Sequence, residues 1–396
     1  MEGDFIKINK WLLPLSWLYG LAVKLRNAMF DIGLLKSRVF QIPVIAVGNI
    51  TVGGTGKTPH VEYLARLLQD HCRVAVLSRG YKRKSRGFVV AEQDTPMRRI
   101  GDEPFQMKQK FPGVTVAVDA NRCHGIDRLT ADDPSLDVVL LDDAFQHRYV
   151  KPGINILLVD YHRIIIYDRL LPAGRLREPL SGKDRADIVI VTKCPQDLKP
   201  MEYRVILKAM NLYPYQQLYF TSLQYDDIRP LFPEKATDNL SADIHQLKSY
   251  HVMVLTGIGS PGQLLHDLEP LTASITPLSF SDHHQFGKKD VARICTTFDS
   301  MPSPKCIITT EKDATRLLLA KGMSDDVSSH LYVLPVRIAF MLGQEEMFNQ
   351  QIIGYVFKNS KDSILLKGKK NSKPSQENSA KEGQDKPARI SFRDNK

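Results

Sequence analysis

Cysteine is scarce in this sequence, and the cysteines that occur are far apart. The chain has five of them, an odd number, among 396 residues. Zinc clusters bind through closely spaced cysteines, and disulfide frameworks use an even number in a short secreted chain. The cysteine pattern therefore argues against both kinds of protein and predicts a reducing compartment.

The sequence also has no apolar run long enough to predict a membrane-spanning helix. In the most apolar stretch, residues 8–30, the uncharged run from Trp11 to Val23 is 13 residues long, whereas a spanning helix needs about 20. Acidic Glu2 and Asp4 count against a signal peptide.

This stretch instead has the period of a helix with one apolar face. Apolar residues recur at steps of three and four, at Ile8, Trp11, Leu15, Leu18, Ala22, Leu25 and Met29. Two tryptophans and a tyrosine beside lysines favour a helix that lies in a membrane interface, within an N-terminal segment of residues 1–35. The alternative is a helix packed on its own domain.

Positive charge is lacking in the body of the chain, although the formal net charge is +10. Residues 1–38 hold six Lys and Arg against three Asp and Glu, and residues 359–396 hold ten against five. A nucleic-acid channel would make the body itself basic, so we expect no nucleic-acid partner. Basic ends suit an anionic membrane surface. The composition of residues 359–396 predicts a disordered tail, for which solvation without a partner is the alternative.

The apolar residues that remain form short runs that alternate with helical stretches. In the first half of the chain these runs lie at residues 42–50, 73–81, 114–122, 137–147, 154–160 and 186–195. Such alternation predicts an α/β fold with a parallel sheet covered on both faces. After residue 200 the pattern restarts, which predicts one domain over residues 36–205 and a second, smaller α/β domain over residues 206–358.

The first apolar run leads into a glycine-rich loop, "GNITVGGTGKTP", at residues 48–59. The loop follows a predicted strand and precedes a predicted helix, as a phosphate-binding P-loop does. Its backbone N–H groups would hold the phosphates of ATP, Lys57 would neutralise the β and γ oxygens, and Thr58 would offer its hydroxyl to Mg²⁺. The predicted nucleotide-binding residues are Thr51, Val52, Gly53, Gly54, Thr55, Gly56, Lys57 and Thr58.

The loop departs from the standard P-loop at its first position, which is Thr51 instead of glycine. We expect this to be tolerated if Thr51 avoids a positive φ. The acids Asp142 and Asp143 end another predicted strand, where ligands bind in such sheets, so one of them is expected to hold Mg²⁺. The first domain is therefore predicted to be P-loop NTPase-like.

The phosphate acceptor is less evident from these residues. A guanine-reading N-K-x-D motif is replaced by "TKCP" at residues 192–195, which weakens the case for a GTPase switch. A kinase needs a base near the acceptor hydroxyl. The candidates are Asp102 and Glu103 in "IGDEPFQ", and a histidine in "FSDHHQF", residues 280–286, of the second domain.

The ordered set of motifs resembles a known family. "GGTGKTP", "LSRGYKRK", "GDEP", "VLLDDAFQHR", "DRLLPAGRLREP", "VTKCP", "TGIGSP", "FSDHHQF" and "TTEKDATRL" occur in this order between about residues 10 and 355. Together they are similar to the tetraacyldisaccharide 4′-kinases of lipid A biosynthesis. A nucleotide-driven switch or chaperone of the partition-ATPase type is the alternative, although Val52 stands where those ATPases carry a lysine.

The resemblance implies an activity, a location and site residues. It implies ATP-dependent phosphorylation of the 4′-hydroxyl of tetraacyldisaccharide 1-phosphate to give lipid IVA, by a peripheral enzyme at the cytoplasmic face of the bacterial inner membrane. It implies a catalytic aspartate, here Asp102, assisted by His283 or, alternatively, His284. Candidate contacts to the sugar or its phosphate are Arg79, Arg175, Arg177 and Glu178.

Overall fold

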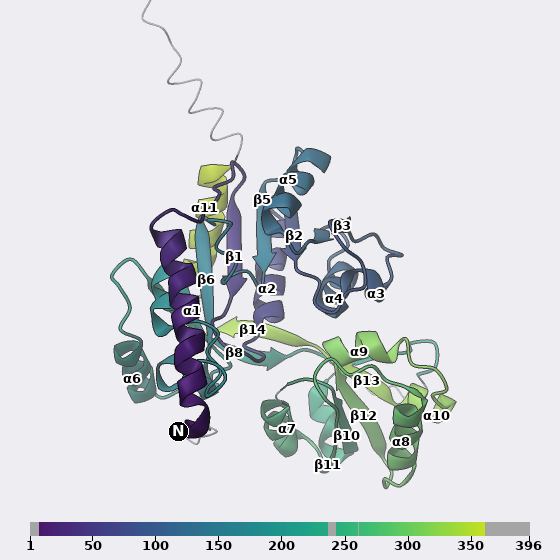
Figure 1. Cartoon of the computed structure of the whole chain (residues 1–396). Coiled ribbons are helices and arrows are strands. Elements are labelled where there is room, and N and C mark those ends of the chain that lie inside the picture. Colours follow the sequence, from purple (N-terminus) through teal and green to yellow (C-terminus); the bar gives the residue numbers. More distant parts are fainter. Residues whose placement is uncertain (1–7, 237–242, 260, 361–396) are drawn as a thin grey trace, which may run out of the picture.

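Figure 1 shows the computed structural model of the chain, which describes residues 8–236, 243–259 and 261–360. From residue 361 onward, the predicted basic tail lies outside the described residues. Two β-sheets organise the molecule. We call the part built on the first sheet, residues 8–225 and 336–360, the large lobe, and the part built on the second, residues 226–335, the small lobe.

The large lobe is built on a nine-stranded sheet. Its strands are parallel except for the two at the edges, β14 and β3, which pair antiparallel with β8 and β4. The strands β1, β2, β5 and β7 are buried along their whole length, because helices cover both faces. Across the sheet the order is β14 (Val336–Phe340), β8 (Gln217–Tyr225), β7 (Ile188–Thr192), β6 (Ile154–Asp160), β1 (Val44–Gly48), β5 (Val138–Asp142), β2 (Val74–Ser78), β4 (Thr115–Val118) and β3 (Val89–Val90).

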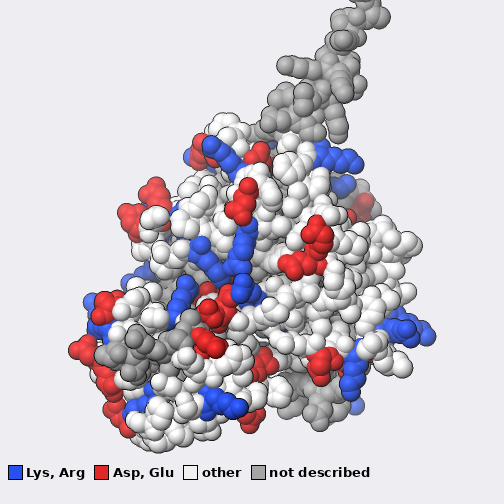
Figure 2. Space-filling model, turned by 180° about the vertical axis from the view of Figure 1, so that it is seen from behind, with Lys and Arg blue, Asp and Glu red and all other residues white. Residues whose placement is uncertain are grey.

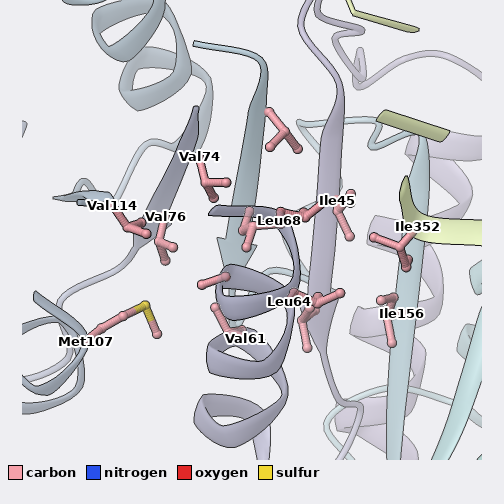
Figure 3. Close-up of a cluster of buried hydrophobic side chains, with 14 of the residues drawn as sticks. Ile45, Val61, Leu64, Leu68, Val74, Val76, Met107, Val114, Ile156 and Ile352 are labelled. Atoms are coloured by element: carbon pink, nitrogen blue, oxygen red, sulfur yellow. The ribbon is translucent and has the colours of Figure 1, made fainter. Parts of the chain in front are cut away.

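Helices lie on both faces of this sheet. On one face the core cluster includes residues of α2 (Lys57–Gln69), α4 (Asp102–Lys110) and α11 (Glu345–Asn359). Figure 3 shows this cluster, with Leu64 of α2 on the side of the helix that faces Ile45 of β1 and Val61 on the side of Met107 of α4. On the other face the clusters include residues of α5 (Arg122–Asp132) and α6 (Pro200–Met210). In Figure 1 the long helix α1 (Leu13–Asp31) crosses the front of the sheet. The short α3 (Met97–Ile100) precedes α4.

The small lobe has its own five-stranded sheet, which lies below and to the right of the large one in Figure 1. The order of its strands is β11 (Ser274–Ser279), β10 (His251–Thr256), β12 (Lys305–Thr310), β13 (Leu331–Leu334) and β9 (Arg229–Pro230). Only β9 pairs antiparallel among these described strands. The helices of this lobe are α7 (Gly262–Leu268), α8 (Lys288–Asp299), α9 (Glu311–Leu317) and α10 (Asp325–Ser329).

The sheets divide the chain differently from the predicted boundary between residues 205 and 206. The strands β8 and β14 both extend the large sheet beyond β7, and α11 returns to the large lobe. Phe348, Ile352 and Val356 of α11 recur at steps of four and are buried in the same cluster as α2. The small lobe is therefore an insertion between β8 and β14, and the large lobe is completed by residues 336–360.

Candidate active site

The P-loop connects β1 to α2 and has the backbone that its glycines allow. Gly53 and Gly56 have φ values of 121° and 79°, in the left-handed region that favours glycine. Thr51 is not among the described non-glycine residues with positive φ. It is buried and forms an antiparallel bridge with Leu176, which explains how threonine replaces the first glycine of the standard loop.

Several side chains that the motif did not predict hold this loop in place. Asn49 Nδ2 donates to Thr55 Oγ1 at 2.8 Å. Lys193 Nζ donates to the carbonyl of Gly54 and lies 2.7 Å from Asp160 Oδ2. The sequence signal for Lys193 was the "TKCP" segment, which had been considered only as a failed guanine motif. Lys193, which directly follows β7, thus links the P-loop to the end of β6, the strand that neighbours β1.

His60, in the first turn of α2, is a further tether. Its Nδ1 lies 2.7 Å from the carbonyl oxygen of Gly56, and its Nε2 lies 3.1 Å from Thr221 Oγ1 on β8. The ring is buried, and burial lowers the pKa of His60 to about 4. The neutral ring is therefore the form that the folded protein holds above that pH.

The two acids after β5 lie beside the P-loop, because β5 is the neighbour of β1 in the sheet. Asp142 is buried and accepts a hydrogen bond from Ser78 Oγ at 3.1 Å. Asp143 is more exposed, and its Oδ1 lies 3.6 Å from Lys57 Nζ. Burial, followed by the charges of Glu103 and Asp143, raises the pKa of Asp142 to about 7.

These groups fit a magnesium nucleotide. Asp142 Oδ1 is buried without a hydrogen-bond partner, although a carboxylate oxygen normally has one. A cation beside it would also relieve the repulsion among the three carboxylates. Among the described residues, no group of three or more His, Cys, Asp or Glu could hold a metal by itself. Mg²⁺ needs no such group, because phosphates and water supply most of its ligands at nucleotide sites.

Asp102 begins α4 and lies where the two lobes meet. Its Oδ2 is 3.2 Å from His283 Nδ1, accepts a hydrogen bond from Arg316 Nε at 2.8 Å, and forms an ion pair with Arg316 Nη2 at 2.7 Å. Burial raises the pKa of Asp102, but the hydrogen bonds from His283 and Arg316 outweigh it and hold the pKa below its ordinary value. Asp102 is thus ionised at neutral pH.

The two histidines of the "DHH" segment contact different partners. His283 has a φ of 58° and turns toward Asp102, where its ring also lies against that of Tyr81. His284 stacks on Phe280 and pairs with Asp290, its Nε2 being 3.0 Å from Asp290 Oδ2. Of the two, His283 is therefore the residue in contact with Asp102.

Two cations of α9 were not assigned to the site from the sequence. Arg316 is fully buried. Nζ of Lys312 lies 3.2 Å from His283 Nε2 and 3.3 Å from Glu103 Oε1. They are four residues apart, so they share one face of the helix. Their spacing within "TTEKDATRL" was visible, but Asp102 and Glu103, which they contact, lie on α4, in the other lobe.

The four candidate substrate residues differ in burial and in the groups that they contact. Arg177 Nη1 lies 3.9 Å from Asp143 Oδ2, which puts it beside the predicted metal ligands. Arg175 and Arg79 are exposed, and the carbonyl of Arg175 accepts a hydrogen bond from Val52 N. Glu178, by contrast, is buried and pairs with Arg185 at 2.7 Å. Its other oxygen, Oε1, is buried without a hydrogen-bond partner, so the expected contact between Glu178 and the substrate stays a prediction.

Helix α1 packs on the large lobe through its small and polar side. Ser16 Oγ and Tyr19 Oη donate to the carbonyls of Leu170 and Arg177, and a Cβ at Gly20 would lie 2.7 Å from Leu170 Cδ1. The apolar side of α1 faces outward and exposes Leu15, Trp17, Leu18, Leu21 and Leu25, and Trp11 in the preceding 3-10 turn (Lys10–Leu12) is exposed as well. Among the described residues, no helix has the length and the apolar character needed to cross a bilayer.

A strand, a glycine loop ending in Lys-Thr, a helix and an acid pair on the neighbouring strand define a P-loop nucleotide-binding protein. The chain matches the family described as tetraacyldisaccharide-1-P 4′-kinase over residues 8–356. The chain therefore belongs to the tetraacyldisaccharide 4′-kinase family, and the partition-type switch is not favoured.

Individual relatives agree with this assignment. The chain is 58% identical over 367 residues to a tetraacyldisaccharide 4′-kinase of Phocaeicola vulgatus, covering 92% of this chain and 99% of the relative. It is 53% identical over 370 residues to the enzyme of Bacteroides thetaiotaomicron, covering 92% and 97%. The fold is similar to the crystal structure of LpxK from Aquifex aeolicus in complex with ATP, with a TM-score of 0.65 and 31% identity over 87% of this chain and 98% of that one.

Proposed function

We propose that this chain transfers the γ-phosphoryl group of ATP to the 4′-hydroxyl of tetraacyldisaccharide 1-phosphate, giving lipid IVA. The observation that carries this proposal is the position of Asp102. Its carboxylate lies next to Glu103, whose charge acts on Asp142 beside the P-loop, and it is held by His283 and Arg316 of the small lobe. A base between a phosphate-binding loop and a second lobe suits transfer to a bound acceptor better than hydrolysis.

In this proposal the P-loop residues bind the nucleotide and Asp102 orients the acceptor. Lys57 neutralises the β- and γ-phosphate oxygens, while Thr58, Asp142 and Asp143 hold Mg²⁺ directly or through water. The acceptor oxygen forms a bond to the γ-phosphorus as the bond from that phosphorus to the ADP oxygen breaks. The proton of the hydroxyl passes to Oδ1 of Asp102, since the contacts to the protein described above all involve Oδ2.

The charges around the site suit an anionic sugar phosphate. Arg177 lies beside Asp143, and the exposed Arg175 and Arg79 lie on the loops that flank the P-loop and follow β2. We assign these three arginines to the disaccharide and its 1-phosphate. Figure 2 shows, on the face opposite to that of Figure 1, charges of both signs interspersed around a central strip of lysines and arginines. That mixture suits a small anionic substrate better than a nucleic acid.

The lipid acceptor also accounts for the outward face of α1. Two exposed tryptophans, Trp17 on α1 and Trp11 in the turn before it, and a row of exposed leucines would enter the interface of a membrane. We therefore place the protein as a peripheral enzyme at the cytoplasmic face of the bacterial inner membrane. A helix that served only to pack on its own domain would turn this face inward.

The test is phosphoryl transfer from radiolabelled ATP to the acylated disaccharide phosphate in detergent micelles. Lys57→Ala is expected to lower kcat by about 10³-fold or more, because the transferring group loses its cation. Lys208→Ala, at an exposed position on α6, serves as the matched control and should retain full activity. ATP turnover that is independent of the lipid and yields no phosphorylated glycolipid would instead support the switch.

A further inference from the structure

The face of α9 that meets α4 carries two cations: Arg316 contacts both Asp102 and His283, and Lys312 contacts His283 from the other side of its ring. Arg316 approaches Asp102 from the small lobe with two nitrogens, Nε and Nη2, and both reach the same oxygen, Oδ2. Its Nη1 is anchored at 2.9 Å by Asp313 and at 3.3 Å by the carbonyl of Gly257. The guanidinium is thus held on both sides and cannot follow Asp102 if the carboxylate turns.

Lys312, one turn earlier, makes the matching contact to the histidine. Its Nζ lies 3.2 Å from His283 Nε2, and an ammonium group can only donate. His283 Nδ1 lies 3.2 Å from Asp102 Oδ2, which as a carboxylate oxygen can only accept. Arg316 Nη2 also lies 3.3 Å from His283 Nδ1, but its shorter contact, at 2.7 Å, is to Asp102 Oδ2. The contacts of the ring to Lys312 and to Asp102 are satisfied together by one neutral form, with its proton on Nδ1 and a lone pair on Nε2.

We propose that Arg316 and Lys312 are positioning residues for the phosphoryl transfer, acting through Asp102 and His283. Arg316 and His283 occupy Oδ2 and leave Oδ1 as the oxygen that receives the acceptor proton. Lys312 fixes His283 in the tautomer that donates to Asp102. The proposal rests on the function proposed above and adds to it that the small lobe sets the orientation of the base.

The carboxylate is also kept charged by this arrangement. Asp102 faces His283 and Arg316 from the small lobe and Glu103 from its own helix, with Lys312 and Asp282 one contact further away. Losing the hydrogen bond that the Arg316 guanidinium donates to Asp102 removes a stabilisation of the ionised carboxylate even where a positive charge remains, and this raises the pKa of that carboxyl. Because the base must be ionised, the acidic limb of the pH profile would move to higher pH.

The first experiment compares Arg316→Lys with the unchanged protein. Lysine keeps a positive charge among the buried carboxylates of Asp102 and Asp313 but cannot donate from two nitrogens in one plane. We expect kcat to fall about 100-fold, as for a misplaced catalytic group, with unchanged affinity for ATP and an acidic limb at higher pH. Arg229→Lys is the matched control, since Arg229 is a mostly exposed cation of the same lobe that contacts Glu311 and not Asp102.

Two results would overturn the role of Arg316. One is a folded Arg316→Lys protein whose kcat stays within twofold of the original. The other is a uniform loss of kcat at every pH with the acidic limb in place, which would mean that Arg316 only supports the fold.

The second experiment needs no turnover, so it separates this inference from the proposed function. In protein with ¹⁵N-labelled histidine, the resonances of His283 are assigned by their loss in His283→Gln. We expect the Nδ1-protonated tautomer in the unchanged protein and a mixture of tautomers in Lys312→Met, which changes a partly exposed side chain. An Nε2-protonated ring in the unchanged protein, or the same tautomer in Lys312→Met, would overturn the role of Lys312. If no phosphorylated lipid forms while both NMR results hold, the proposed function fails and the arrangement of the pair stands.

Discussion

The buried ring of His60 makes a quantitative prediction about acid stability. Its pKa is about 4 in the folded protein because burial disfavours the charged form, whereas an unfolded chain has the ordinary value of about 6.5. Between these values the unfolded state binds more protons, so stability is lost as the pH falls. From pH 7.5 to pH 5.0, this one group should lower the free energy of unfolding by about 2 kcal/mol.

The assay is urea unfolding followed by far-ultraviolet circular dichroism at those two pH values. We expect the loss of unfolding free energy on acidification to be smaller by about 2 kcal/mol in His60→Gln than in the original protein. His71→Gln changes an exposed histidine two residues beyond the end of α2 and should leave the original pH dependence in place. An equal loss in His60→Gln and the original protein would refute the reasoning, because it would show that His60 titrates alike in both states.

Three further perturbations test other parts of the structure. Lys193→Met removes the charged hydrogen bond to Gly54, and we expect the affinity for ATP, measured by calorimetry, to fall about tenfold or more. An affinity within twofold of the original would contradict the role of Lys193 in holding the P-loop. Trp11→Ser combined with Trp17→Ser should abolish most co-sedimentation with anionic vesicles. Leu319→Ser, which changes an exposed leucine of the small lobe, should not. Equal sedimentation of both variants would show that the N-terminal tryptophans do not bind the membrane. Gly153→Ala would place a Cβ 1.9 Å from the Tyr355 hydroxyl and should lower stability by about 1–3 kcal/mol. In the control Gly113→Ala, nothing lies within 4 Å of the added Cβ, and an equal loss in both would contradict the predicted clash.

The elements around the nucleotide site could be predicted from the sequence because their signals are local. Uninterrupted apolar runs identified the buried strands, since a parallel sheet covered on both faces needs no alternation. The residues 154–160 were predicted as a strand and form β6 with the same bounds. The glycine loop followed directly from spacing, and Thr51 met the stated condition on φ.

Other features depended on contacts between distant parts of the chain. Neither β8 nor β14 has a sequence feature that indicates which sheet it joins, so the boundary between the lobes was placed elsewhere. The choice between His283 and His284 turned on one positive φ, which rotates adjacent side chains toward different partners. The burial of Glu178 beside Arg185 could not be predicted from its neighbours in the sequence, and its contact with the substrate stays a prediction.

The insertion of the small lobe between β8 and β14 has a consequence for synthesis. A ribosome releases residues 226–335 before the strand and helix that complete the nucleotide-binding half. Until Phe348, Ile352 and Val356 have been synthesised, the part of the large-lobe core that they cover stays exposed to solvent. The last-synthesised part of the described chain therefore completes the large lobe, which the ribosome begins first. A protein shortened before residue 336 would have a complete small lobe attached to an incomplete large lobe.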